Sequence, residues 1–493
     1  MTHLPSGKAI TRTDELGYFI YRYTDDGGAT WSPELYNITT RQTAIDRNNS
    51  FNGKTSIFWN VDQFKHRGND TYAMFTKINQ YVQNPPEQGF ILHSPNAMTE
   101  LDASKIVWDF LPDGDEGPGC PQGFDPAATV AEEWHVLPLL NSSGFYAVFR
   151  TNIGLLGAAQ TADPTGKTGW GASSYARFQQ PPLPGSASNI TSSLKNPRGP
   201  ITVKRFSNGL YLMLWFNNGA DSYQTQVTAS ISSRNPYWLS SGIEVDGSIV
   251  FSQPEIVLYI DGSHATADSR IGYPDFIEDV DGSIWISETD KATARVHRID
   301  EHLLTNLFGQ FTVNSVATDD ALFSIASPAN GSSTNLPSTS WPDLSNQTAH
   351  CGFSIDMWVE GQGERSLFAS SSGRNAISIV QASTGAISLQ ATQDNITTTL
   401  TTDLACTNAL AIAGQHYIAF TVDAAARVVT VMVDGKLCDG SLVSTRGWGW
   451  LEDAQTEVQG GDTATFGPGI QLIRMYGRAL YTSEALGNFR AGV

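Results

Sequence analysis

The chain of 493 residues lacks several features that would assign it quickly to a class of protein. Charged residues make up only 16% of it, and 30 lysines and arginines stand against 49 aspartates and glutamates. The resulting net charge of −19 repels nucleic acid and anionic membrane surfaces. No stretch approaches the roughly 20 apolar residues of a membrane-spanning helix. We therefore expect neither nucleic acid nor a membrane as a partner.

Cysteine is scarce as well, because the chain has only four. Two of them, Cys406 and Cys438, fall in one C-terminal region and could form a disulfide, which would require an oxidising compartment. Four free thiols are the alternative. No Cys/His spacing indicates zinc, and we expect no metal or other cofactor.

A signal peptide is also lacking, since Met1–Gly7 contain no apolar segment. The chain is therefore either cytosolic or a secreted protein from which the signal has been removed. Glycosylation sequons of the form Asn-x-Ser/Thr favour secretion. Eight occur, at Asn37, Asn48, Asn69, Asn141, Asn189, Asn330, Asn346 and Asn395. We expect a secreted, extracellular and monomeric protein.

Turn-forming residues are abundant, with 45 glycines and 23 prolines. Residues 1–312 form short apolar-rich segments separated by turn signals, which is typical of strands grouped into propeller blades. One such group begins at 58–62 and turns at 67–70. A helix is expected over 301–308, with Asp300 as its cap. We predict a five- or six-bladed β-propeller that carries the catalytic site.

The C-terminal third has a different pattern. Residues 347–493 alternate apolar and polar positions, as in 353–359 and 428–433, which is typical of a two-sheet sandwich. The polar segment 313–346 before it is expected to be a linker or a first sandwich strand. The predicted fold class is therefore all-β, a propeller followed by a jelly-roll β-sandwich.

The segment Tyr23–Trp31, with the sequence YTDDGGATW, resembles the Asp-box of the sialidase superfamily, Ser/Thr-x-Asp-x-Gly-x-Thr-Trp. Gly28 permits a tight hairpin, Asp26 can accept backbone N–H bonds in the turn, and Trp31 should pack between neighbouring strands. A degenerate copy with altered spacing occurs at Thr161–Trp170. Asp-boxes lie on the outer turns of blades, so the resemblance implies the fold and not the catalytic residues.

Other stretches of the first 310 residues resemble sialidase-like proteins, namely Asn196–Arg198, Arg234–Trp238, Phe251–Glu255, Tyr273–Asp275 and Trp285–Thr289. Sialidases carry an Arg-Ile-Pro motif near the N-terminus that grips the sialic acid carboxylate, and this sequence has none. The resemblance thus implies glycan chemistry without implying sialidase activity.

The C-terminal region resembles laminin-G and concanavalin-like domains, through Phe353–Trp358, His416–Phe420 and Val433–Gly435. Related domains often hold calcium, but no EF-hand-like ligand spacing supports a metal here.

In a propeller the innermost strand of each blade lines the central channel, and residues at the strand starts converge on one mouth. A glycoside hydrolase needs an acid and a base or nucleophile, and Glu132 or Glu133 with Asp275 are the predicted carboxylates. Tyr273 is a candidate nucleophile of the sialidase kind, activated by a nearby glutamate. Because Glu132 and Glu133 are adjacent in a strand, they should point to opposite faces. At most one of them is expected to face the channel.

A uronate lyase is the second chemistry that fits. It neutralises the sugar carboxylate with arginine and removes a proton with histidine or tyrosine, which His66, His135 and Tyr273 could supply. Both chemistries suit an anionic sugar, because a guanidinium binds a carboxylate through two parallel hydrogen bonds. The residues predicted to bind substrate are Asp62, Arg67, Arg150, Arg198, Arg234, Arg270 and Glu288.

Three functions follow in order of preference. The first is an extracellular, exo-acting glycoside hydrolase that releases a terminal sugar, expected to be acidic, from a glycan or polysaccharide. The second is a polysaccharide lyase that cleaves a uronate-containing chain by β-elimination. The third is a glycan-binding protein without catalytic activity.

Overall fold

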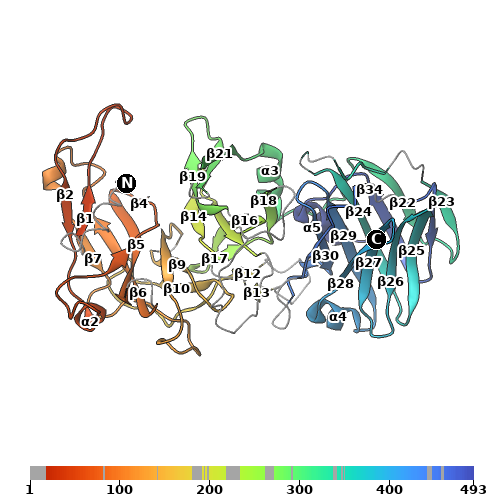
Figure 1. Ribbon diagram of the computed structural model, residues 1–493, viewed down its shortest axis with the longest axis horizontal. Coiled ribbons are helices and arrows are strands. Elements are labelled where there is room, and N and C mark those ends of the chain that lie inside the picture. Colours follow the sequence, from red (N-terminus) through yellow and green to blue (C-terminus); the bar gives the residue numbers. More distant parts are fainter. Residues whose placement is uncertain are drawn as a thin grey trace.

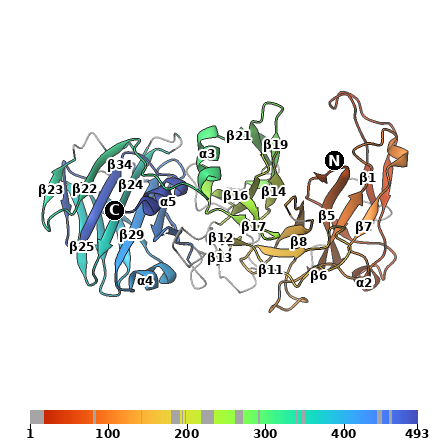
Figure 2. The same ribbon diagram turned by 180° about the vertical axis from the view of Figure 1, so that it is seen from behind.

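The computed structural model describes residues 18–80, 84–141, 143–179, 191–193, 195–196, 199–217, 234–260, 271–289, 293–336, 341–345, 348, 350–440, 447–456 and 460–493. Strands dominate, and the predicted fold class, an all-β propeller followed by a sandwich, is confirmed. The propeller sheets and the sandwich lie at opposite ends of an elongated molecule (Figures 1 and 2). Among these residues no helix has the length and apolarity needed to cross a membrane.

The described part of the first half contains five sheets. The first has β1 (Tyr18–Tyr21) and β2 (Tyr36–Thr39); the second has β3 (Phe58–Trp59), β4 (Lys65–Arg67), β5 (Asp70–Gln80), β6 (Asn84–Ser94) and β7 (Asp109–Leu111); the third has β8 (Glu132–Pro138), β9 (Phe145–Arg150), β10 (Gly157–Thr161) and β11 (Ser174–Tyr175). The fourth has β12 (Arg177–Gln179), β13 (Thr191–Ser193), β14 (Thr202–Arg205), β15 (Tyr211–Phe216), β16 (Tyr237–Val245), β17 (Ser248–Phe251) and β18 (Glu255–Leu258); the fifth has β19 (Gly272–Glu278), β20 (Ile284–Thr289) and β21 (Ala294–Arg298).

The innermost strands β4, β8, β14 and β19 pack against one another in that order. The side chain of Gln63, just before β4, donates to the carbonyl of Phe276 on β19 (3.4 Å), which closes the ring. The sheet β1–β2 instead covers the second sheet, where the ring of Phe19 lies 4.1 Å from that of Phe58. Four sheets thus line the axis in the described residues, and a fifth lies against one of them.

The four inner strands run in the same direction. At their starts, Tyr273 of β19 contacts Glu133 of β8. At their finishes, the Arg205 guanidinium of β14 donates to the carbonyl of His66 on β4 (3.2 Å). The axis therefore has a start end, near Tyr273, and a finish end, near His66.

The two Asp-box segments form matching hairpins. Asp26 accepts from the backbone N–H of Thr30 (2.8 Å) and from its hydroxyl (2.6 Å). Asp163 likewise accepts from the N–H and the hydroxyl of Thr168, both at 2.8 Å. The bonds from Thr30 lower the pKa of Asp26 to about 2, and those from Thr165, together with those from Thr168, lower the pKa of Asp163 to about 2. Trp31 stays 39% exposed, so the prediction that it packs between strands is wrong.

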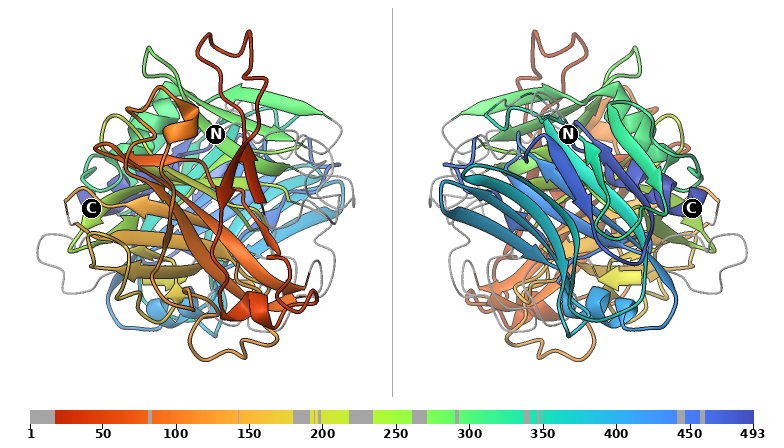
Figure 3. Two further views of the ribbon diagram at one scale, coloured as in Figure 1. Left: turned by 90° about the vertical axis from the view of Figure 1, so that its left-hand side faces the viewer. Right: turned by 90° about the vertical axis from the view of Figure 1, so that its right-hand side faces the viewer.

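The sandwich has two sheets, seen from the end in the right-hand view of Figure 3. One contains β22 (Ala321–Ala326), β24 (Gly352–Glu360), β29 (Gln415–Asp423), β30 (Val428–Val433), β31 (Lys436–Leu437), β32 (Gly449–Trp450) and β34 (Ile470–Tyr476); the other contains β23 (Ser333–Asn335), β25 (Arg365–Ser372), β26 (Asn375–Gln381), β27 (Ile387–Gln393), β28 (Ile396–Thr401) and β33 (Thr463–Phe466). The segment 313–346 thus supplies two sandwich strands, β22 and β23. Cys406 and Cys438 form the predicted disulfide.

Helices are short, namely α2 (Ala44–Arg47), η1 (Ala103–Lys105), α3 (Glu301–Gly309), α4 (Leu404–Leu410) and α5 (Thr482–Ala491). The predicted helix is α3, and Asp300 caps it by accepting from the N–H groups of His302 and Leu303. The alternating pattern of β24 buries Phe353, Ile355 and Met357 in the sandwich core.

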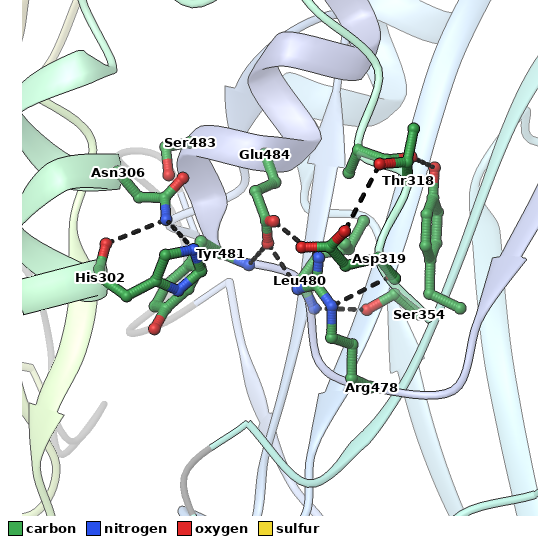
Figure 4. Close-up of polar contacts among 12 residues, drawn as sticks. His302, Asn306, Thr318, Asp319, Ser354, Arg478, Leu480, Tyr481, Ser483 and Glu484 are labelled. Carbon is green, nitrogen blue, oxygen red and sulfur yellow. Dashed lines mark hydrogen bonds and ion pairs between the residues drawn. The ribbon is translucent and has the colours of Figure 1, made fainter. Parts of the chain in front are cut away.

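The two halves meet at a polar joint between β18 and α5. Glu255 is buried and accepts from the backbone N–H groups of Thr482 (2.9 Å) and Ser483 (3.0 Å), at the start of α5. Figure 4 shows this helix with Arg478 and Glu484 on its sandwich side and α3 on the other. Burial raises the pKa of Glu255 to about 7, although its two backbone donors oppose the shift.

Candidate active site

Both predicted glutamates of β8 turn to the same arginine. The Oε1 atom of Glu133 lies 2.7 Å from Nη1 of Arg150, and Oε1 of Glu132 lies 3.3 Å from its Nε. The register of β8 against β9 shifts between Glu132 and His135, and Glu133 has a φ of 55°. The prediction that the two side chains point to opposite faces is therefore wrong, because a bulge interrupts the alternation of the strand.

Tyr273 lies at the start of β19, also in a bulge, with a φ of 45° and a register shift between Gly272 and Asp275. Its hydroxyl donates to Oε1 of Glu133 (3.0 Å). Tyr273 is 44% exposed, whereas Glu133 is buried behind it. The negative charge of Glu133 and burial raise the pKa of Tyr273 to about 12. The phenol is therefore neutral at pH 7 and holds its proton against a carboxylate.

Two arginines flank this pair. The Arg234 guanidinium lies 5.6 Å from the centroid of the Tyr273 ring, within the range of a cation–π contact. Its buried Nε has no hydrogen-bond partner among the described residues. Burial opposes ionisation of Arg150, but the charges of Glu133 and Glu132 outweigh it and raise the pKa of Arg150. We call Glu132, Glu133, Arg150, Arg234 and Tyr273 the tyrosine cluster.

Gly272 is a residue of this site that sequence analysis missed. A Cβ atom there would lie 2.6 Å from the carbonyl oxygen of Thr289 and 3.5 Å from Nη1 of Arg234. Only glycine fits between these groups. The position of Gly272 directly before Tyr273, the predicted nucleophile, is the feature of the sequence that could have identified it.

Asp275 belongs to a different group. Its Oδ1 accepts from the hydroxyl of Thr202 (3.3 Å), and burial raises its pKa. The fully buried Lys65 is its charged neighbour, and burial is the main cause that lowers the pKa of Lys65. Asp275 is thus on the same strand as Tyr273, but its neighbours are Thr202 and Lys65 of the channel interior.

Asp62 and His135 lie still deeper. The Asp62 carboxylate accepts from the backbone N–H groups of Met74 (2.9 Å) and Val136 (3.1 Å), and contacts His135 Nδ1 (2.9 Å) and Lys65. Both side chains are buried, and burial lowers the pKa of His135 well below its usual range. Asp62 thus joins β5 to β8, and the roles of Asp62 as a substrate ligand and of His135 as a catalytic base stay predictions.

His66 and Arg67 lie at the finish end of the axis. The Arg67 guanidinium donates to the carbonyls of Ser143 (2.7 Å), Gly144 (3.1 Å) and Pro164 (2.5 Å), and lies 4.5 Å from the Phe145 ring centroid. The prediction that both residues share a mouth with the catalytic carboxylates is wrong. They are the last two residues of the inner strand β4, so they lie at its finish and not at its start.

The remaining predicted ligands contribute less. Glu288 on β20 pairs with Arg295 and with His297 (3.2 Å) of β21. Arg198 and Arg270 lie outside the described residues. In the described part of the chain, the one group with metal-ligand geometry is Asp403, Cys406 and Cys438, whose two cysteines are already joined.

No known family profile matches the sequence, and no curated protein is similar to it in sequence. Among solved structures, a sialidase from Trypanosoma rangeli is similar at 13% identity and a TM-score of 0.31, over 95% of this chain and 88% of that one. An exo-inulinase from Aspergillus awamori is similar at 10% identity and a TM-score of 0.32, over 94% of this chain and 93% of that one. The CBM40 of a Ruminococcus gnavus IT-sialidase is similar at 12% identity and a TM-score of 0.24, and the match covers 34% of this chain and 97% of that one. Scores this low assign neither a family nor a function, so the site rests on its own geometry.

Proposed function

We propose that the protein is a glycoside hydrolase in which Tyr273 is the nucleophile and Glu133 its general base. The observation that carries this is the 3.0 Å hydrogen bond from the Tyr273 hydroxyl to a buried carboxylate, with Arg150 and Arg234 beside it. A hydroxyl becomes a useful nucleophile when an adjacent base takes its proton during attack. With a pKa of about 12, Tyr273 needs such a base at neutral pH.

The chemistry balances as a double displacement. Tyr273 Oη bonds to the anomeric carbon while its proton passes to Glu133, and the glycosidic C–O bond breaks. The leaving oxygen takes a proton from an acid, which we assign to Asp275 because it lies two residues beyond Tyr273 on β19 and because burial raises the pKa of its carboxyl. In the second step a water molecule gives one proton to the Asp275 carboxylate while its oxygen bonds to the anomeric carbon, the bond from that carbon to Tyr273 Oη breaks, and Tyr273 recovers its proton from Glu133.

An anionic sugar suits this site better than a neutral one. A sugar with a carboxylate at its anomeric carbon repels a carboxylate nucleophile, and a neutral phenol avoids that repulsion. Arg150 is committed to Glu132 and Glu133. Arg234, whose Nε has no hydrogen-bond partner in the described ranges, is the better ligand for the carboxylate of the substrate.

We extend the proposal to release of a terminal sugar. The cluster consists of one tyrosine and four side chains around it, so it offers contacts to a single sugar residue. The lyase alternative loses support, since His135 is buried and His66 lies at the finish end.

Aryl glycosides of acidic sugars, together with uronate-containing polysaccharides, test the proposal. Release of phenol and of a saturated acidic sugar is expected. An unsaturated uronate product would favour the lyase instead. Glycan binding without turnover on any of these substrates would favour the non-catalytic protein.

We also propose secretion. The disulfide supports an oxidising compartment. All six sequon asparagines within the described ranges have exposed side chains: Asn37, Asn48, Asn69, Asn141, Asn330 and Asn395. Secretion from a eukaryotic host should give a protein whose mass falls on treatment with an N-glycanase. An unmodified mass would contradict the glycosylation part of the proposal.

A further inference from the structure

A cavity of about 300 Å³ lies between the third and fourth propeller sheets, and none of its described lining residues belongs to the tyrosine cluster. Its wall comes from β9, β10 and β11 on one side and β17 on the other. Figure 1 labels β9, β10 and β17 and Figure 2 labels β11 and β17 in the middle part of the molecule. The volume is at the lower end of the range of about 300–1,000 Å³ for ligand sites, which suits one small ring.

The floor of the cavity contains the side chain of Tyr146. Tyr146 is 5% exposed, and its ring packs near Phe251 with centroids 6.3 Å apart. Burial raises the pKa of Tyr146, so its hydroxyl is a neutral donor and acceptor.

Small residues create the space above this hydroxyl. Ala158 and Ala159 are buried on the floor, and Gly171 and Ala172 are exposed at the rim. Polar groups complete the wall, with the Gln160 amide and the hydroxyls of Ser174 and Ser248, and a second aromatic ring comes from Tyr175. Among the residues that the structure describes, none that lines the cavity carries a charge.

We infer that this cavity is a second binding site, for one uncharged sugar ring, separate from the site of bond cleavage. Tyrosine rings match the C–H face of a pyranose, and neutral amide and hydroxyl groups match its hydroxyls. The absence of charge in the lining distinguishes the site from the tyrosine cluster, which contains two arginines and two glutamates. The choice of a sugar as ligand rests on the proposed function, whereas the preference for a neutral, ring-sized ligand rests on the cavity.

The test uses the full chain with the methyl glycosides of glucose, galactose, mannose and fucose, and with glucuronic acid as the charged counterpart. Saturation-transfer difference NMR and titration calorimetry should show at least one neutral sugar binding with a dissociation constant on the order of millimolar. Glucuronic acid should not compete for the site. If none of the four neutral sugars binds saturably, the proposal is overturned.

Two variants locate the binding. Tyr146→Phe removes only the hydroxyl and should weaken binding about 2- to 10-fold. Ala172→Trp fills the exposed rim and should abolish binding, whereas Ala321→Trp, at an exposed position of β22, should not. Binding that survives both cavity variants would place the sugar elsewhere and refute the site.

The same variants keep this inference apart from the proposed function. Ala172→Trp should leave the turnover of a small acidic aryl glycoside unchanged, because the tyrosine cluster is intact. Tyr273→Phe should leave neutral sugar binding unchanged. Sugar binding without turnover by the wild type would refute the proposed function and leave the cavity site standing.

Discussion

Two buried glutamates, Glu133 at the start end of the propeller axis and Glu255 at the joint with the sandwich, have opposite surroundings. Both oxygens of Glu255 accept from backbone N–H groups of α5. Glu133 instead binds two side chains, Tyr273 and Arg150, through one oxygen, and its Oε2 has no partner in the described residues. Backbone partners hold a structural carboxylate in place, whereas side-chain partners and a spare oxygen leave Glu133 able to exchange a proton.

The arginines show the same contrast. Arg67 donates to three backbone carbonyls at the finish end, and Arg234 lies over a tyrosine ring with a spare donor at the start end. Residue type alone does not distinguish a structural residue from a residue of the active site, because each role is filled here by one glutamate and one arginine. The identity of the partner separates them.

The largest effect is expected at Tyr273. Tyr273→Phe should lower kcat on the order of 10⁴-fold, because it removes the nucleophile, and Glu133→Gln should lower it about 10²- to 10⁴-fold, because it removes the base. Steady-state kinetics on an acidic aryl glycoside would measure both. Tyr23→Phe, at an exposed tyrosine of the Asp-box hairpin, is the matched control and should keep full activity. A Tyr273→Phe enzyme with full kcat would refute the assignment.

Glu255 should govern stability in a limited pH range. Its pKa in the folded protein is about 7, above the ordinary 4.5, so between these values the folded chain keeps a proton that the unfolded chain has lost. Stability should therefore fall as pH rises from 4.5 to 7, by at most about 3 kcal/mol.

Glu255→Gln should remove this part of the pH dependence of the free energy of unfolding, measured in urea at several pH values. Glu301→Gln, the control, changes a carboxylate that is 78% exposed and should leave the pH dependence of the free energy of unfolding unchanged. Parallel curves for wild type and Glu255→Gln would contradict the role of the joint.

Arg67→Ala should reduce the free energy of unfolding by about 2 kcal/mol, because it removes charged hydrogen bonds to backbone carbonyls and a cation–π contact. The kcat of the folded fraction should not change. Arg374→Ala removes an exposed ion pair with Asp394 and should be close to neutral in thermal denaturation. A raised KM in Arg67→Ala would instead place Arg67 in the substrate site.

The smallest effect is expected at Arg234. Arg234→Lys keeps the charge but loses the planar fork, so KM for an acidic substrate should rise about 10-fold with little change in kcat. Arg205→Lys makes the same exchange at the finish end and should leave KM unchanged. Equal effects of the two exchanges would remove the distinction between the two ends of the axis.

Much of the fold could be predicted from the sequence, because turn signals and strand alternation are local. The Tyr273–Glu133 pair was also within reach, since both residues begin an inner strand. The bulge that turns Glu132 and Glu133 to one arginine could not be predicted, because it depends on a left-handed backbone at Glu133, which is not a glycine. Arg67 was misplaced because its carbonyl partners lie 76 to 97 residues away along the chain.

The joint has a consequence for how the molecule can be divided. α5 contains Thr482–Ala491, almost the last residues of the chain, yet its first N–H groups bind Glu255 of the propeller. The Gln253 side chain next to it donates to the carbonyl of Gly435 in the sandwich (2.7 Å). Cutting the chain between the halves would leave Glu255 without its two backbone donors. It would also leave the first N–H groups of α5 without their acceptor. The propeller and sandwich are consecutive in sequence but are not interchangeable modules, and a transplanted sandwich would need this propeller surface to come with it.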